Sequence, residues 1–277
     1  MFEIITKREL NIQVKLMEIN APYIAKKAQP GQFVIIRIDE KGERIPLTIA
    51  DYDINKGTIT IIFQEVGKTT KKLGELNEHD YILDLVGPLG MESHLEGYKN
   101  VAVIGGGLGI AIAYPQAKKL HSLGAKVDTI VGFRNKDLII LEKEIKEVSS
   151  TLNITTDDGS NGNKGFVTDA LKKLVEQGNK YDLVIAIGPL IMMKAVSNVT
   201  KSYGLKTVVS MNSIMIDGTG MCGGCRVTVD GKIKFACVDG PEFDGHKVDF
   251  DEAMRRQSIY KEEESKSLET HTCRLGG

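Results

Sequence analysis

The chain has 277 residues, 42% of them hydrophobic and 26% charged, with a formal net charge of −1, which allows two or three domains with cores of their own. The near-neutral balance argues against nucleic acid as a partner, because phosphate backbones are usually bound by basic faces. The N-terminus lacks an apolar signal core and the longest apolar stretch, 101–115, is interrupted by glycines, so we expect a cytoplasmic protein without membrane insertion.

The pattern of residues 1–98 predicts a small antiparallel barrel. Strands are expected at 2–7, 12–19, 32–38, 45–49, 58–64 and 81–86, with one short helix at 69–76 and turns containing glycine or proline between the strands. Two sets of barrel residues are candidates for cofactor binding: Pro46, Leu47 and Thr48 on a strand, and Gly67, Thr69 and Thr70 at the helix start. A helix start suits a pyrophosphate, although each set alone is also typical of an ordinary strand or cap.

From residue 99 the pattern changes to alternating strands and helices. Strands are expected at 101–104, 126–131, 153–155, 183–187 and 206–210, of which 101–104 and 183–187 are apolar throughout. They are separated by helices to about 123 and at 138–148, 168–176 and 189–202. Apolar strands of this kind are buried on both faces. The pattern therefore predicts a parallel sheet between helices, a Rossmann-like domain over residues 99–213.

The first of these strands enters a glycine turn that opens a helix. Gly105, Gly106, Gly107 and Gly109 would let backbone N–H groups and the helix N-terminus approach a pyrophosphate. The turn departs from G-x-G-x-x-G because Ile110 occupies the last position, and such a turn can also serve tight packing alone. Its place at the first strand of a repeated strand–helix pattern favours nucleotide binding.

The carboxyl ends of the later strands carry further candidates. The second strand leads to Arg134 with no acidic residue at its tip, a pattern that suits a 2′-phosphate and so NADP. Asp157 and Asp158 follow the third strand and Gly188 follows the fourth, at the edge where open α/β sheets bind ligands. A surface charge, a polar turn and a helix start would explain the same residues.

Three cysteines and an aspartate lie close together near the end of the chain. Asp217, Cys222, Cys225 and Cys237 have the spacing D-x4-C-x2-C-x11-C, which is the plant-type [2Fe–2S] pattern with aspartate as the first ligand. Zinc held by the three cysteines and His246 is the alternative. Glycines around the cysteine pair favour the cluster, because they let backbone N–H groups point at its sulfurs. We assign this module to residues 214–249.

The remaining residues, 250–277, form a charged tail. We expect the tail to be helical, and we expect its Cys273 to be an unliganded thiol. Because such a helix has little apolar face of its own, we expect it to pack on a partner.

A nucleotide site and an iron–sulfur cluster in one chain imply a third cofactor. Nicotinamide delivers two electrons as hydride whereas the cluster accepts one, and flavin is the standard cofactor that converts between them. We therefore expect FAD where the barrel faces the nucleotide domain. No general acid or base is required by this chemistry, and none stands out.

The whole chain resembles the ferredoxin–NADP reductase superfamily, and within it electron-transfer subunits with a C-terminal [2Fe–2S] module. The resemblance is carried by 30–33, 44–51, 65–70, 87–90, the glycine turn, 132–137 and 217–237. The superfamily's R-x-Y-[ST] flavin motif lacks its tyrosine here, and Arg44 lies one residue off register. The resemblance therefore implies flavin contacts for Pro46, Leu47 and Thr48 more than for Arg44.

Two groups of relatives differ at the first cluster ligand. Dihydroorotate dehydrogenase electron-transfer subunits have cysteine there, whereas the small subunits of NADH-dependent ferredoxin–NADP oxidoreductases have aspartate, as Asp217 is here. Resemblance to the second group implies NAD(H) instead of NADP. It also implies hydride exchange with FAD, and one-electron transfer to a larger subunit with a second flavin and [4Fe–4S] clusters.

The assembly would then couple NADH to ferredoxin and NADP(H) by electron bifurcation, which this chain alone would not perform. Two alternatives to this function stay open at this point. One is partnership with dihydroorotate dehydrogenase. The other is a regulatory nucleotide-binding module stapled by zinc.

Overall fold

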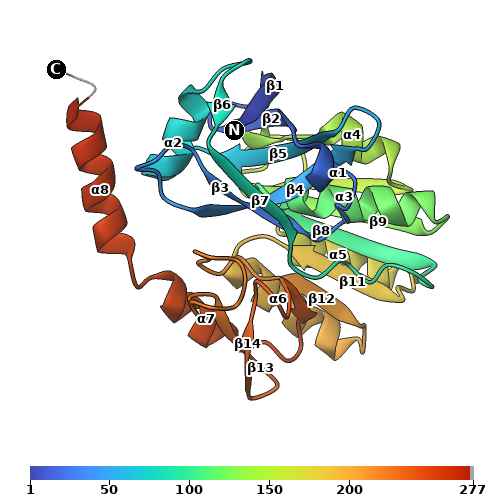
Figure 1. Ribbon diagram of the computed structural model, residues 1–277. Coiled ribbons are helices and arrows are strands. Elements are labelled where there is room, and N and C mark those ends of the chain that lie inside the picture. Colours follow the sequence, from blue (N-terminus) through green and yellow to red (C-terminus); the bar gives the residue numbers. More distant parts are fainter. Residues whose placement is uncertain (275–277) are drawn as a thin grey trace.

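The computed structural model describes residues 1–274, and their side chains as far as Glu269. A curved antiparallel sheet is followed by a second, mostly parallel sheet between helices, then by a hairpin and two C-terminal helices (Figure 1). The predicted fold class, a β-barrel followed by a Rossmann-like α/β unit and a small C-terminal module, is confirmed.

Seven strands form the barrel in the order β6-β1-β2-β5-β4-β3-β7. They are β1 (Phe2–Glu9), β2 (Val14–Asn20), β3 (Phe33–Arg37), β4 (Ile45–Asp53), β5 (Thr58–Gln64), β6 (Tyr81–Ile82) and β7 (Asp84–Leu89), accompanied by helices α1 (Pro22–Ala25) and α2 (Lys68–Glu75). All their pairings are antiparallel. β6 and β7 are the two ends of this order yet adjoin in the chain, so the sheet curls back towards itself. The expected single strand at 81–86 is thus two strands.

The barrel has two packed surfaces because side chains alternate along each strand. On β5, Ile59, Ile61 and Phe63 point into the barrel and are buried there. Ile62, between them, points outward and packs with Val14 against the core of the second unit. The barrel is therefore attached to the nucleotide unit through an apolar interface.

The second sheet has the order β10-β9-β8-β11-β12-β15. Its strands are β8 (Asn100–Gly106), β9 (Lys126–Phe133), β10 (Thr151–Thr156), β11 (Leu183–Ile187), β12 (Thr207–Ser210) and β15 (Glu242–Asp244). The first five are parallel and β15 is antiparallel to β12. The strand order reverses between β8 and β11, and ligands of open α/β sheets bind at such a switch point.

Helices cover both faces of this sheet, as the apolar strands predict. They are α3 (Gly109–Ser122), α4 (Glu142–Glu147), α5 (Val167–Glu176) and α6 (Leu190–Ser202). α3 and α4 contribute to the core on one face and α5 and α6 to the core on the other. The expected helix at 138–148 is wrong in its first part: a 3-10 turn (Lys136–Leu138) precedes α4, and Leu141 between them has a φ of 56°, which an α-helix does not accommodate.

The C-terminal module is joined to the sheet instead of standing apart from it. β13 (Arg226–Val229) and β14 (Lys232–Phe235) form a hairpin whose turn residues, Asp230 and Gly231, both have positive φ. The module also supplies β15, the edge strand of the nucleotide sheet, for which we predicted no strand. Three residues between Pro241 and Gly245 are too few to show a period, which is why sequence alone missed it.

A partly buried polar contact joins three parts of the chain. The Glu242 carboxylate on β15 accepts hydrogen bonds from Ser93 Oγ at 2.6 Å and from Gln116 Nε2 on α3. Ser93 belongs to the segment that leaves the barrel. Glu242 therefore lies where the barrel, the nucleotide unit and the C-terminal module meet.

The charged tail divides into two helices that behave differently. α7 (Phe250–Gln257) packs on its own chain, since Phe250 and Ala253 are buried in the core beside α6. α8 (Lys261–Arg274) instead extends away from the C-terminal module and contacts α2 of the barrel (Figure 1). The predicted helical tail is thus present in two parts, and its expected packing on a partner stays a prediction. Cys273, expected to be unliganded, lies beyond the residues whose side chains are described.

Candidate functional site

A cleft of about 1100 Å³ lies between the barrel and the carboxyl edge of the nucleotide sheet. Nine of the predicted cofactor residues line it: Pro46, Leu47, Thr48, Gly106, Gly107, Gly109, Arg134, Asp157 and Gly188. The cleft slightly exceeds the size of a usual small-molecule pocket. It is large enough to hold parts of two nucleotide cofactors.

The glycine turn contains glycines of two kinds. A Cβ on Gly105 would lie 2.8 Å from Ile110, and one on Gly109 would lie 2.2 Å from the carbonyl oxygen of Ile187, so these two allow the strand and helix to pack closely. Gly107 differs, because its φ is 54° and open space surrounds the position of a Cβ. Gly107 is therefore the glycine of the turn beside which a ligand has room to approach the start of α3, while its own N–H is donated to the carbonyl oxygen of Gly132 at 2.8 Å.

The barrel wall of the cleft comes from β4. Leu47 packs partly against the barrel core, while Pro46 and Thr48, one residue to either side, alternate to the opposite face. Arg44, for which the resemblance implied little, has another role. Its Nε donates a hydrogen bond of 2.9 Å to the carbonyl oxygen of Ile216, which ties the barrel to the loop that carries the cysteines.

The candidates at the start of α2 do not line the cleft. Thr69 Oγ1 donates to Glu43 Oε2 at 2.5 Å, and Thr70 Oγ1 accepts the N–H of Gly67 at 3.0 Å. The Thr70 hydroxyl stabilises the helix start itself, and the Thr69 hydroxyl ties it to Glu43. Their predicted contact with a pyrophosphate stays a prediction, and it would require these local bonds to be exchanged or shared.

Polar groups at the carboxyl edge of the sheet differ in their orientation. Arg134 and Asp157 line the cleft. Asp158 does not, because its carboxylate accepts hydrogen bonds from Ser160, which hold its pKa below the usual value. Asn212 and Ser213, after β12, line the cleft and were missed, although they follow the fifth strand of the pattern at the same edge. Gln257 of α7 also lines it, and no sequence signal pointed to that residue.

The cysteine loop is organised around Asp217. Its carboxylate accepts hydrogen bonds from the backbone N–H groups of Thr219, Met221 and Cys222 at 2.9–3.1 Å. Desolvation works in the opposite direction, but these bonds outweigh it and lower the pKa of Asp217 to about 2. The aspartate is therefore ionised under ordinary conditions, as a metal ligand has to be.

The four predicted ligands lie in two pairs. Cys222 Sγ is 3.4 Å from Asp217 Oδ1. Cys225 and Cys237 are both buried, and burial together with the neighbouring Cys225 thiol raises the pKa of Cys237 to about 12. Among the described side chains, no three histidines, cysteines or carboxylates converge as they would around a single metal ion. A two-iron cluster instead takes two protein ligands on each iron, and two pairs fit that requirement.

His246, the fourth ligand of the zinc alternative, is engaged elsewhere. Its Nε2 lies 2.9 Å from Thr200 Oγ1 on α6. A site of three thiolates and one imidazole therefore receives no support from the structure. The pairs that the structure shows are Asp217 with Cys222 and Cys225 with Cys237, and neither includes an imidazole.

Comparison with known proteins gives consistent matches. Residues 212–249 match the model of the iron–sulfur cluster binding domain of dihydroorotate dehydrogenase B. A protein from Thermotoga maritima named as a homologue of the dihydroorotate dehydrogenase B (NAD(+)) electron transfer subunit is 51% identical, over 96% of this chain and 94% of its own. An uncharacterised protein from Clostridium beijerinckii is 56% identical, over 96% and 93%.

A solved structure is also similar over nearly the whole chain. It was described for flavin-based electron bifurcation by the NADH-dependent reduced ferredoxin–NADP oxidoreductase, and it matches with a TM-score of 0.92 and 50% identity over 97% of this chain and 96% of that one. Among the helices of the described residues, none is long and apolar enough to cross a membrane.

Proposed function

Because the chain belongs to the family of dihydroorotate dehydrogenase B electron-transfer subunits and their homologues, we propose that it exchanges hydride between NAD(H) and FAD and passes single electrons to a larger partner subunit. In this proposal the complete enzyme is a bifurcating NADH-dependent ferredoxin–NADP oxidoreductase, the enzyme for which the similar solved structure was described, and it is cytoplasmic. The partner carries a second flavin and [4Fe–4S] clusters. Bound FAD supplies the conversion between hydride and single electrons.

One observation carries this proposal: the cleft and the cysteine loop adjoin. Met215 lines the cleft and lies two residues before Asp217. A cofactor in the cleft would therefore lie near a cluster held by Asp217, Cys222, Cys225 and Cys237. The electrons can then leave the cleft along the loop that forms part of its wall.

The residues of the cleft fall into one group that binds the flavin and another that binds NAD(H). Pro46, Leu47 and Thr48 hold the flavin on the barrel side, with Gly67, Thr69 and Thr70 near its pyrophosphate. The glycine turn presents Gly107 to the pyrophosphate of NAD(H), while Arg134, Asp157 and Gly188 line the same edge. We retain the division into 1–98 for FAD, 99–213 for NAD(H) and 214–249 for the cluster.

Metal analysis and spectroscopy of the purified protein test this function. We expect iron and acid-labile sulfide, a visible flavin spectrum that NADH bleaches, and an EPR signal after reduction. Zinc without iron or flavin would overturn the proposal and support a regulatory module instead.

Partnership with a dihydroorotate dehydrogenase is the second candidate, because the family model of the cluster domain comes from that enzyme. Asp217 in the first ligand position favours the oxidoreductase. Co-purification from the native organism separates the two candidates. A dihydroorotate dehydrogenase bound to the chain would favour the second, and a larger flavin and [4Fe–4S] subunit the first.

A further inference from the structure

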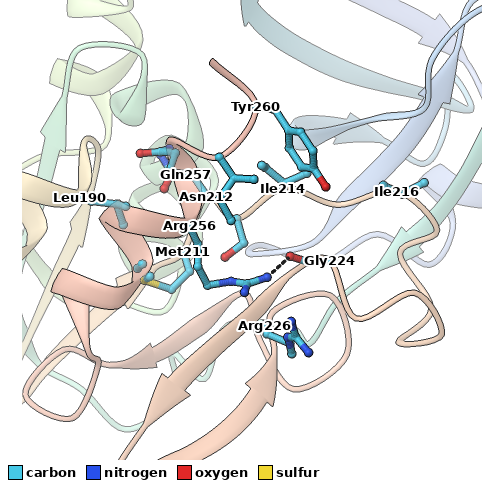
Figure 2. Close-up of a pocket in the computed structure, with 13 residues that line it drawn as sticks. Leu190, Met211, Asn212, Ile214, Ile216, Gly224, Arg226, Arg256, Gln257 and Tyr260 are labelled. Atoms are coloured by element: carbon cyan, nitrogen blue, oxygen red, sulfur yellow. Dashed lines mark hydrogen bonds between the residues drawn. The ribbon is translucent and has the colours of Figure 1, made fainter. Parts of the chain in front are cut away.

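A small pocket beside the cysteine loop contains two arginines. The pocket lies between the loop after β12, the loop at Gly224 and the end of α7 (Figure 2). Arg256 reaches from α7 and its Nη2 donates a hydrogen bond of 3.2 Å to the carbonyl oxygen of Gly224 (Figure 2). Gly224 stands between the predicted ligands Cys222 and Cys225, so this contact is made within the loop that would hold the cluster.

The helix that presents Arg256 is firmly attached to the body. Asp249 caps α7 by accepting the N–H of Glu252 at 2.9 Å, and Phe250 and Ala253 are buried in the core. Lys194 on α6 bonds to Asp251 at 2.7 Å. The position of α7 is therefore fixed, and with it the point from which the Arg256 side chain reaches the loop.

The bond to Gly224 orients a peptide unit. In a trans peptide the carbonyl and the following N–H point in opposite directions. When Arg256 holds the carbonyl of Gly224, the N–H of Cys225 is directed away from Arg256. Cys225 is buried, and its N–H has no hydrogen-bond partner among the described residues. The N–H of Gly224, one peptide earlier, is directed at Cys222 Sγ at 3.5 Å.

We propose that Arg256 is a positioning residue of the cluster site: it fixes the Gly224–Cys225 peptide so that the Cys225 N–H is available to cluster sulfur, and it raises the reduction potential. This inference rests on the proposed function. Both effects have the same sign, because hydrogen bonds to sulfur and a nearby positive charge favour the reduced form, which carries one more negative charge. Arg226, exposed in the same pocket and without an ion pair among the described residues, adds charge but no bond to the loop.

Substitutions of neighbouring arginines on α7 separate this role from general surface charge. Arg256→Gln removes both the positive charge and the guanidinium that bonds to the Gly224 carbonyl. Arg256→Lys keeps the charge but loses the planar guanidinium. Arg255→Gln, also in the last turn of α7, removes the same charge from an exposed side chain with no contact to the loop. Each full-length protein is analysed for iron and sulfide, then titrated with redox mediators while its EPR signal is recorded.

We expect Arg256→Gln to retain iron but to lower the ratio of reduced to oxidised cluster at fixed potential by about three- to tenfold. For a one-electron couple this is about 30 to 60 mV towards more negative potential. Arg256→Lys should fall between Arg256→Gln and the unmodified protein, and Arg255→Gln should match the latter.

Equal potentials and EPR spectra for Arg256→Gln and Arg255→Gln would overturn the inference while leaving the proposed function intact. If Arg256→Gln fails to retain iron, Arg256→Lys is the variant that tests the inference. An EPR spectrum and a potential of Arg256→Lys identical to those of the unmodified protein would exclude a positioning role. Absence of iron from the unmodified protein would overturn the proposed function itself and this inference with it.

Discussion

Replacing Glu242 by glutamine should change how the stability of the protein depends on pH. The carboxyl group is enclosed at the junction of the three units, beneath Ser93 and Gln116. Burial raises its pKa from the ordinary 4.5 to about 7, although the hydrogen bonds from Ser93 and Gln116 act in the opposite direction. The folded protein therefore keeps this proton over a pH range in which the unfolded chain has released it.

The sign and size of the effect follow from this difference. Between pH 4.5 and about 7 the folded state binds more protons, so the free energy of unfolding falls as pH rises through that window and this loss is constant above it. At about 1.4 kcal/mol per pH unit over about 2.5 pH units, the loss reaches at most about 3.5 kcal/mol. Glutamine is neutral throughout, and its amide oxygen can accept the bonds from Ser93 and Gln116. Glu242→Gln should therefore gain up to about 3.5 kcal/mol of stability near pH 8 and little near pH 4.5.

Denaturant unfolding of the two proteins at both pH values measures this gain, because other titrating groups cancel in the difference between variants. Glu92→Gln is the matched control, since Glu92 is exposed on the same connecting segment as Ser93 and its substitution removes the same charge. The control should leave the pH dependence unchanged. The reasoning would be refuted by an equal pH dependence in Glu242→Gln and the unmodified protein.

Substitutions at three further positions test the cofactor sites. Asp217→Cys should retain a [2Fe–2S] cluster with an altered EPR spectrum and potential, whereas an unchanged cluster in Asp217→Ala would show that the aspartate is not a ligand. Gly107→Val should abolish NADH oxidation but leave FAD bound, because a side chain at a φ of 54° is strained and would enter the cleft. Loss of flavin instead, seen in the visible spectrum, would place the two cofactors differently. Arg44→Met should cost about 1 kcal/mol of loop stability through the lost bond to Ile216 and so speed the release of iron to a chelator. An unchanged rate would mean that this bond does not stabilise the loop.

The sequence predicts those parts of the molecule that rest on local patterns. The apolar strand at Leu183–Ile187 and the strand at Thr58–Gln64 have the bounds that were predicted, because burial on one or both faces leaves a clear period. The glycine turn likewise identifies residues that line the cleft, and the cysteine spacing identifies the residues of the two pairs. These features depend on the local backbone conformation and on the spacing of the ligand residues, and both can be recognised from residues that lie close together in the sequence.

Other parts depend on contacts between distant segments and leave no local signal. The bond from Arg44 to Ile216 and that from Arg256 to Gly224 join residues far apart in sequence, and each arginine looks like an ordinary surface charge. The threonines at the start of α2 satisfied a phosphate pattern, yet their hydroxyls bond to Glu43 and Gly67. A polar group near a helix start can serve a ligand or the helix itself, and only its neighbours decide which.

The edge strand β15 makes the C-terminal module and the nucleotide sheet a single folding unit. A chain ended at residue 213 would leave the backbone of β12 unpaired along one side, and exposed strand edges promote aggregation. The same chain would lose Glu242, which holds Ser93 and Gln116. The electron-carrying loop therefore cannot be removed to leave a simple flavin reductase behind. The first consequence of removing the segment after residue 213 would be a failure of the remaining chain to fold.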